Sequence, residues 1–202
     1  MRLIVALSVA GMLLTGASAT AGPSAPHEPD IVVGTCSVCH GHDGISPTAK
    51  FPNLAAQTEP YLETQLQNFR NHQRGDYYAK AYMWTMAGTL SDKTIKQIAE
   101  YFSALQPAKG ATNEDAGRVA AGKTIFEQGI TSENVPACGV CHGATATGTT
   151  MAPRLAGQHS EYLVVQLQAF RDNTRDNAIM HANVAQMTDQ QMREIAAYLA
   201  SL

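Results

Sequence analysis

The sequence predicts an all-α protein built as a tandem repeat, because segments of the first half recur in the second and apolar residues recur with helical period in both. Segment 51–57 (FPNLAAQ) recurs as 152–158 (APRLAGQ), and segment 65–70 (QLQNFR) recurs as 166–171 (QLQAFR). Strand signals are scarce. Self-similarity of this kind is typical of a chain that repeats one structural unit, so we expect two small domains with the same fold.

Two helices can be placed in each half. Pro60 suits the first turn of a helix that runs to about Asn71, and its counterpart begins near Ser160 or Glu161. A last helix in each half follows the N-cap residues Ser91 and Thr188. Apolar residues at helical spacing predict the buried face of each last helix (Ile95, Ile98, Ala99, Phe102 and Leu105; Met192, Ile195, Ala196 and Leu199).

The repeat and the composition predict the domain limits. Residues 1–21 combine a basic start, an apolar run shorter than the ~20 residues of a membrane span, and a small-residue exit, as cleavable signal peptides do. The first domain is expected at 22–106, a linker at 107–114 and the second domain at 115–202. We therefore expect an exported, periplasmic protein; retention of the signal as an N-terminal anchor is the alternative.

Charge and spacing add two smaller expectations. When Arg2 is removed with the signal, the 14 basic side chains become 13, against 17 acidic ones. Neither half has a run of like charge, so nucleic acid is not expected as a partner. The offset between the halves falls from 101 to 97 after Arg70, which predicts four extra residues in a loop around Arg74–Lys80.

The cysteines form two short motifs, CSVCH at 36–40 and CGVCH at 138–142. C-x-x-C-H is the attachment signature of c-type haem: the thiols add to the porphyrin vinyl groups and the histidine binds the iron. A redox-active dithiol would need a βαβ context, and a four-cysteine zinc site would need the two pairs to meet. The predicted attachment sites are Cys36, Cys39, Cys138 and Cys141, and the predicted iron ligands are His40 and His142.

The repeat also indicates the second ligand of each iron. Met83 lies seven residues before Leu90, and Met180 lies seven before Met187, which aligns with Leu90. A methionine thioether is a soft ligand that raises the reduction potential of a haem iron. We predict Met83 and Met180 as ligands, with Met86 as the competitor in the first half. Core packing without ligation is the alternative for each.

Other residues are expected to support these sites. Pro52 and Pro153 could each offer a carbonyl to the second ring nitrogen of the axial histidine, or serve only as turn prolines. Leucines that follow them would pack on the haem face (Leu54 and Leu155). Met151 and Met192 are expected to pack in the core. The remaining histidines are expected to be exposed or hydrogen-bonded (His42, His72, His159 and His181), and the paired arginines to meet a haem propionate or solvent (Arg70 and Arg171).

Together these motifs resemble the dihaem cytochromes c of the c4 type. The resemblance covers essentially the whole mature chain: two C-x-x-C-H-G motifs, two P-x-L-x-x-Q stretches (52–57 and 153–158), the Y-L-x-x-Q-L-Q helices and the methionine before each last helix. It implies two class I cytochrome c domains related by a pseudo-twofold axis, neighbouring haem propionate edges, and two covalently bound haem c groups with His/Met ligation.

The resemblance also implies a function. It indicates an electron carrier, not an enzyme, that moves electrons from a quinol-oxidising complex towards a terminal oxidase, directly or through a small copper or haem carrier. Peripheral association with the membrane is compatible with this role. One alternative is the dihaem electron-accepting subunit of a dehydrogenase, such as a flavocytochrome sulfide dehydrogenase. A dihaem peroxidase is the weaker alternative, because it needs an open or displaceable iron position.

The first half departs from the pattern at its leading helix. In the second half, apolar residues at helical spacing could cross the last helix as in class I cytochromes (Val119, Gly122, Ile125 and Phe126). The first half has only residues 31–33 between Pro29 and the cysteine motif. We expect a truncated leading helix there, and a first domain that is less stable or that uses this surface for a partner.

Overall fold

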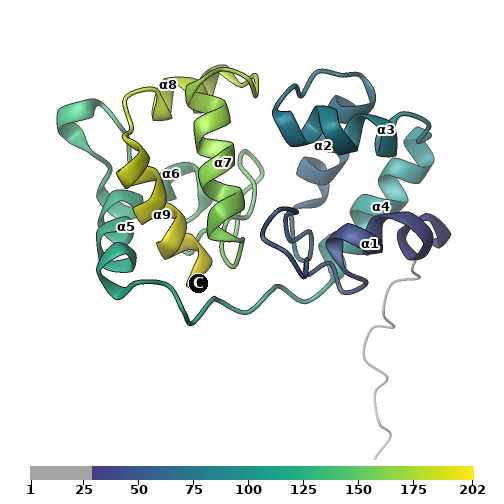
Figure 1. Ribbon diagram of the computed structural model, residues 1–202, viewed down its shortest axis with the longest axis horizontal. Helices are drawn as coiled ribbons and strands as arrows, with labels where there is room; N and C mark the ends of the chain where they lie inside the picture. Colours follow the sequence, from purple (N-terminus) through teal and green to yellow (C-terminus); the bar gives the residue numbers. More distant parts are fainter. Residues whose placement is uncertain (1–28) are drawn as a thin grey trace, which may run out of the picture.

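The computed structural model describes residues 29–202, which form two helical domains joined by an irregular linker (Figure 1). The signal peptide predicted for residues 1–21 lies outside the described residues. Within 29–202 the β-type pairing is limited to an isolated bridge between Ile130 and Val135. The predicted all-α class and the predicted repeat of two domains are therefore confirmed.

The main helices follow the same order in both domains. The first domain contains η1 (Val32–Cys36), α1 (Ser37–His40), α2 (Glu59–Arg70), η2 (Ala79–Met83), α3 (Trp84–Ala87) and α4 (Asp92–Ala104). The second contains α5 (Ala116–Gln128), η3 (Thr131–Glu133), α6 (Gly139–His142), α7 (Ser160–Arg171), α8 (Ala178–Val184) and α9 (Asp189–Ala200). Segments η1 and η2 are π-helical, and η3 is a 3-10 turn. Thus α2 and α4 correspond to α7 and α9.

The predicted N-caps fix where the last helices begin. The Ser91 hydroxyl accepts a hydrogen bond from the N–H of Thr94, and the Thr188 hydroxyl accepts one from the N–H of Gln191. The Gln191 side chain in turn accepts from the N–H of Thr188, which completes a capping box. Each cap satisfies a backbone donor that has no partner within the helix, so both last helices begin at equivalent positions.

Each domain has its own apolar core, built where α2 packs against α4 and α7 packs against α9. The apolar stripes predicted on the last helices are buried, apart from Leu105, which is partly buried. Fully buried side chains at the centre of the cores include Phe102 and Ile95 in the first domain and Phe126 and Met192 in the second.

The leading helices differ between the domains, as expected. In the second domain α5 crosses α9 so closely that a Cβ added to Gly122 would lie 2.0 Å from the carbonyl oxygen of Glu194. In the first domain the helical residues begin only at Asp30 and run directly into the cysteine motif. The first domain therefore has no helix equivalent to α5 among the described residues.

The four extra residues of the first domain form a helical turn, so the predicted loop around Arg74–Lys80 is confirmed for 74–76 and wrong for 77–80. Asp76 precedes a helix that begins at Tyr77 and continues through η2 to Met83. In the second domain Asn177 is the N-cap of α8, and Met180 follows only three residues later. Four residues are about one turn of helix, so the insertion lengthens the helix before Met83 by one turn.

The linker runs along one side of both domains and meets the end of the chain (Figure 1). Segment 105–115 between α4 and α5 contains no helix and includes the predicted linker 107–114. The N–H of Ala111 donates to the carbonyl of Ala200 at 2.7 Å. A Cβ added to Gly157 would lie 2.8 Å from the carbonyl oxygen of Ala108, so the linker also passes close to the second P-x-L-x-x-Q stretch.

Candidate functional site

Each cysteine motif forms a short helical turn at the surface of its domain. Valines between the paired cysteines are highly exposed, Val38 at 74% and Val140 at 77%. The turns end at Gly41 and Gly143, which have φ angles of 77° and 82°. This left-handed region favours glycine, and a Cβ at Gly41 would lie 2.3 Å from a backbone oxygen. The glycine after each histidine therefore reverses the chain in a conformation that strains other residues, and at Gly41 a side chain would also clash with the backbone.

Both motif histidines are buried and held by the predicted proline carbonyls. Nδ1 of His40 lies 2.9 Å from the carbonyl oxygen of Pro52, and Nδ1 of His142 lies 2.9 Å from that of Pro153. The carbonyls can only accept, so each Nδ1 donates and leaves Nε2 as the ring nitrogen available to a metal. Burial lowers the pKa of both histidines, although the carbonyl contacts oppose this. A neutral imidazole is the form that binds iron.

The paired thiols lie within reach of the same sites. All four cysteines are free and partly buried. Burial raises the pKa of the first thiol of each pair, Cys36 and Cys138, to about 11. Two thiols three positions apart, followed by a histidine with an available Nε2, are the donor set that covalent haem attachment requires.

Hydroxyl groups fix the second cysteine of each pair, a contact that the sequence reasoning missed. The Ser46 hydroxyl donates to the carbonyl of Cys39 at 2.8 Å, and the Thr149 hydroxyl donates to the carbonyl of Cys141 at 2.8 Å. The two hydroxyl residues do not align at the offset that relates the motifs. Their shared position between the motif and the proline was the available signal.

The predicted methionine ligands occupy equivalent positions beside the two cores. Four partly buried residues pack against the first core, and their counterparts pack against the second core in the same way (Cys36 and Cys138, Leu54 and Leu155, Leu66 and Leu167, Met83 and Met180). Met86 is not among them and is 46% exposed. The structure thus brings Met83 and Met180 to the same apolar surroundings as the attachment cysteines and the leucines that follow the prolines.

The other expectations for methionine and histidine have mixed outcomes. Met192 is fully buried, as predicted, but Met151 is 81% exposed, so its assignment to the core is wrong. It lies in a polar turn in which its own N–H donates to Thr149. The prediction for the remaining histidines is confirmed. His42 and His72 are exposed, and His72 stacks on Trp84; His159 is hydrogen-bonded to the carbonyl of Ser46, and His181 to that of Phe170.

The paired arginines of α2 and α7 bind the start of the last helix in each domain. Arg70 donates to the carbonyl of Leu90 at 2.9 Å and pairs with Asp92 at 2.8 Å. Arg171 pairs with Asp189 at 2.7 Å in the same manner. Each arginine therefore joins two helices while its side chain stays partly exposed. The expected contact with a haem propionate stays a prediction.

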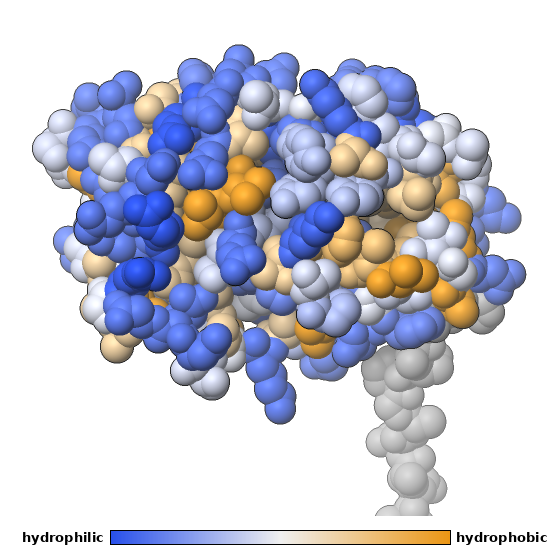
Figure 2. Space-filling view, viewed as in Figure 1, coloured by the Kyte–Doolittle hydropathy of each residue, from blue (hydrophilic) through white to orange (hydrophobic). Residues whose placement is uncertain are grey.

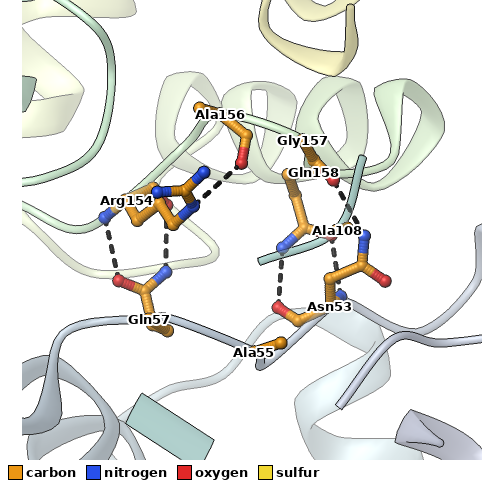
Figure 3. Close-up of a pocket in the computed structure, with 8 residues that line it drawn as sticks. All are labelled: Asn53, Ala55, Gln57, Ala108, Arg154, Ala156, Gly157 and Gln158. Atoms are coloured by element: carbon orange, nitrogen blue, oxygen red, sulfur yellow. Dashed lines mark hydrogen bonds between the residues drawn. The ribbon is translucent and has the colours of Figure 1, made fainter. Parts of the chain in front are cut away.

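The P-x-L-x-x-Q stretches meet at the domain interface and bind each other reciprocally (Figure 3). The side-chain amide of Gln57 donates to the carbonyl of Arg154 at 2.9 Å and accepts from its N–H at 2.8 Å. Gln158 makes the same two contacts with the backbone of Asn53, at 2.9 and 2.8 Å. Two equivalent pairs of bonds indicate a pseudo-twofold relation between the domains.

A second reciprocal cluster joins α2 and α7. Arg74 donates to Gln166 at 2.7 Å, and Arg175 donates to Gln65 at 3.1 Å, so each buried guanidinium binds a glutamine of the other domain. The carboxylate in contact with this cluster is Asp76, which lies 2.7 Å from Arg74. Burial alone would raise the pKa of Asp76, but Arg74, together with Arg175 and Gln166, lowers it below its ordinary value. The offset of 101 continues to Arg74 and Arg175, and that signal was missed.

The surface shows no single dominant patch on the face drawn in Figure 2. Hydrophilic side chains cover much of this face, and apolar residues gather in separate areas of the two domains. Among the described residues, no helix is both long and apolar enough to cross a membrane.

Comparison with known proteins agrees with this geometry. The Cytochrome c family model matches residues 30–106 and 119–202. Cytochrome c-552 of Acidithiobacillus ferridurans is 39% identical over 195 residues, covering 95% of this chain and 84% of the relative. Cytochrome c4 of Azotobacter vinelandii is 34% identical over 200 residues, covering 94% and 93%. The solved cytochrome c4 of Acidithiobacillus ferrooxidans has a TM-score of 0.79 at 39% identity, over 83% of this chain and 98% of that one.

One further relative has a more specific name. The thiosulfate dehydrogenase electron acceptor of Thiomonas intermedia is 32% identical over 207 residues and covers 100% of this chain and 91% of its own length. With two matched domains, two attachment motifs and relatives that share nearly their full length, the chain belongs to the cytochrome c family, as a dihaem electron carrier of the c4 type with two covalently attached haem c groups.

Proposed function

We propose that the chain is a periplasmic electron carrier in which His40 and Met83 bind one iron and His142 and Met180 bind the other. The haem c groups would be attached through the two cysteine pairs, Cys36 and Cys39 in the first domain and Cys138 and Cys141 in the second. The observation that carries the ligand assignment is the matched set of residues beside the two cores, which contains a methionine in each domain at the same position.

The chain's own residues hold the redox centres rather than react. Haem c supplies a one-electron couple when it is bound. The thiols would fix the porphyrin covalently, and the Pro52 and Pro153 carbonyls orient the histidine rings. Because both candidate ligands are neutral groups in partly or wholly buried positions, they favour ferrous iron and a raised potential. Methionines at matched positions in both domains would leave neither iron open to a substrate, so we propose a carrier and not an enzyme.

The proposed route runs from a quinol-oxidising complex towards a terminal oxidase, directly or through a small copper or haem carrier. A second route has a specific observation in its favour, because one full-length relative is named as the electron acceptor of thiosulfate dehydrogenase. In that case the donor would be a dehydrogenase. Kinetics of reduction by each purified donor separate the two routes: the physiological donor should reduce both haems rapidly, and the other should not.

A redox titration of methionine variants tests the ligand assignment. Met83→Ala and Met180→Ala should each lower the potential of one haem and remove its share of the methionine-to-iron charge-transfer band, because the thioether that stabilises ferrous iron is lost. Met86→Ala is the matched control and should leave both haems unchanged.

Two outcomes would contradict the proposal. If Met86→Ala changes a haem and Met83→Ala does not, the first-domain ligand is wrong. Robust turnover of hydrogen peroxide by the pre-reduced protein would overturn the carrier role, since it requires an iron position that the methionines do not block.

A further inference from the structure

We propose that each domain tunes the iron of the other domain, through the side-chain amides of Gln57 and Gln158. The inference rests on the proposed ligation by His40 and His142. Gln57 and Gln158 would act as positioning residues: each binds, from across the interface, the peptide group that holds the opposite axial histidine.

The connection to the first domain is a continuous chain of hydrogen bonds. His40 Nδ1 donates to the carbonyl of Pro52 at 2.9 Å. That carbonyl belongs to the peptide group whose N–H is carried by Asn53, and this N–H donates to Oε1 of Gln158 at 2.8 Å. A single amide unit therefore separates the histidine of one domain from a side chain of the other.

An equivalent chain of hydrogen bonds reaches the second domain. His142 Nδ1 donates to the carbonyl of Pro153 at 2.9 Å. The N–H of the same peptide group, on Arg154, donates to Oε1 of Gln57 at 2.8 Å. The equivalence of the two chains, bond by bond, shows that the arrangement follows from the way the domains pack and not from one local contact.

Both glutamine side chains are fixed and shielded from water. They are buried at 7% and 8% exposure. Nε2 of each also donates to the carbonyl of the residue that it binds. Each Oε1 also accepts a hydrogen bond from the N–H of the residue that follows the glutamine in the sequence, Thr58 at 2.9 Å and His159 at 3.1 Å. The acceptor oxygens therefore have little freedom to leave the opposite peptide.

The physical consequence is that the carbonyl which binds each histidine becomes a stronger hydrogen-bond acceptor. An amide whose N–H is hydrogen-bonded is polarised, so its carbonyl becomes a better acceptor. A better acceptor at Nδ1 makes the imidazole a more basic ligand. A more basic ligand stabilises ferric iron. Packing of the second domain should therefore lower the potential of the first haem, and packing of the first domain should lower that of the second.

The test replaces each glutamine with methionine, which has a similar length but no amide oxygen. Gln158→Met should raise the potential of the haem in the first domain, and Gln57→Met that of the haem in the second. In the reduced protein, labelled with ¹⁵N-histidine, the Nδ1–H proton of the opposite histidine should shift upfield as its hydrogen bond weakens. Gln65→Met is the matched control, because Gln65 lies at the same interface but binds Arg74 and Arg175 and not a proline peptide.

Glutamate variants provide a second arm with the opposite sign. Gln158→Glu keeps the oxygen that accepts from the N–H of Asn53 but loses the N–H that donates to the Asn53 carbonyl. At a pH where its carboxyl is ionised it also adds negative charge, so it should then lower the potential of the first haem and shift the His40 proton downfield. If the methionine and glutamate variants shift the potential in the same direction, or if a variant affects its own domain as much as the opposite one, the inference is wrong. An equal shift with Gln65→Met would also overturn it, because general loosening of the interface would then explain the effect.

Failure of the inference can be told apart from failure of the proposed ligation. If His40 and His142 bind iron, their ring protons in the reduced wild-type protein carry large ring-current shifts. Their absence contradicts the ligand set itself. Their presence, with no crossed change in the glutamine variants, contradicts the cross-domain tuning alone.

Discussion

The last helix of the second domain is covered on two sides, whereas its counterpart in the first domain is covered on one. On α9, which α5 crosses at Glu194, Ala197 is 1% exposed and Ala200 is 4% exposed. The aligned positions on α4 are Glu100, which is exposed, and Ser103, which is partly buried. Both domains nevertheless hold a histidine on a proline carbonyl at 2.9 Å. The leading helix therefore adds stability to one domain and is not needed to position the histidine.

The largest effect is expected where α5 crosses α9. In Gly122→Ala the new Cβ would overlap the backbone of Glu194, so the helices must separate and domain 2 should lose about 3 kcal/mol of unfolding free energy. The matched control is Gly34→Ala, where a Cβ meets nothing within 4 Å; it should stabilise the first domain by up to about 1 kcal/mol.

Denaturant unfolding with two probes can assign these changes to a domain. Trp84 is the single tryptophan of the chain, so its fluorescence follows the first domain, while far-UV circular dichroism follows both. Gly122→Ala should move part of the dichroism transition and leave the Trp84 transition in place. If the Trp84 transition moves equally, the domains unfold as one unit and the contrast between them does not hold.

A smaller effect is expected at the buried carboxylate found only in the first domain. Asp76 is 2% exposed and pairs with Arg74, whereas the aligned Asn177 is exposed. Asp76→Asn should cost about 2 kcal/mol at pH 7, because a buried guanidinium loses its carboxylate. Asn177→Asp should be nearly neutral, since aspartate is an equally good N-cap.

The cost of Asp76→Asn should depend on pH. The pKa of Asp76 in the folded state lies below its ordinary value because of Arg74, so its contribution is complete above the unfolded pKa of about 4. The contribution is lost as the pH falls through the lower folded pKa. Unfolding of wild type and variant at a series of pH values should therefore converge in acid; a constant difference would contradict the pairing.

The smallest effect concerns the residue before the interface glutamine. Gly157 has a φ of 72°, and the aligned Ala56 has a φ of 55°. Gly157→Ala should destabilise the second domain by about 1–2 kcal/mol, because the left-handed conformation is strained for alanine and the Cβ would press on Ala108. Ala56→Gly should not destabilise the first domain in the same two-probe unfolding assay. Equal losses in the two variants would show that the linker contact is unimportant.

Much of the fold could be predicted from the sequence because the repeat shows α2 and α4 a second time, as α7 and α9. The caps at Ser91 and Thr188 and the contacts of Pro52 and Pro153 are local, so a short motif is enough to indicate them. The helical turn after Asp76 was not predicted, because the change of offset located the insertion without giving its conformation.

The contacts between the domains could not be predicted from the sequence pattern. Gln57 and Gln158 were visible as repeated residues, but hydrogen bonds from a side chain to a distant backbone leave no trace in residue identity. Arg74 and Arg175 were not paired because the change of offset was placed at Arg70, whereas the offset of 101 continues through Arg74. Met151 was assigned to the core on residue type alone, and its exposed position shows the limit of that reasoning.

Because the linker joins the two domains, their interface needs less binding strength to keep them docked. Segment 105–115 joins the domains and lies against the end of α9 through Ala111. A short tether of this kind makes docking intramolecular, with an effective concentration in the millimolar range. An interface of glutamine and arginine hydrogen bonds then need not be strong enough to hold two separate proteins together. The domains can remain docked although the contacts between them are polar.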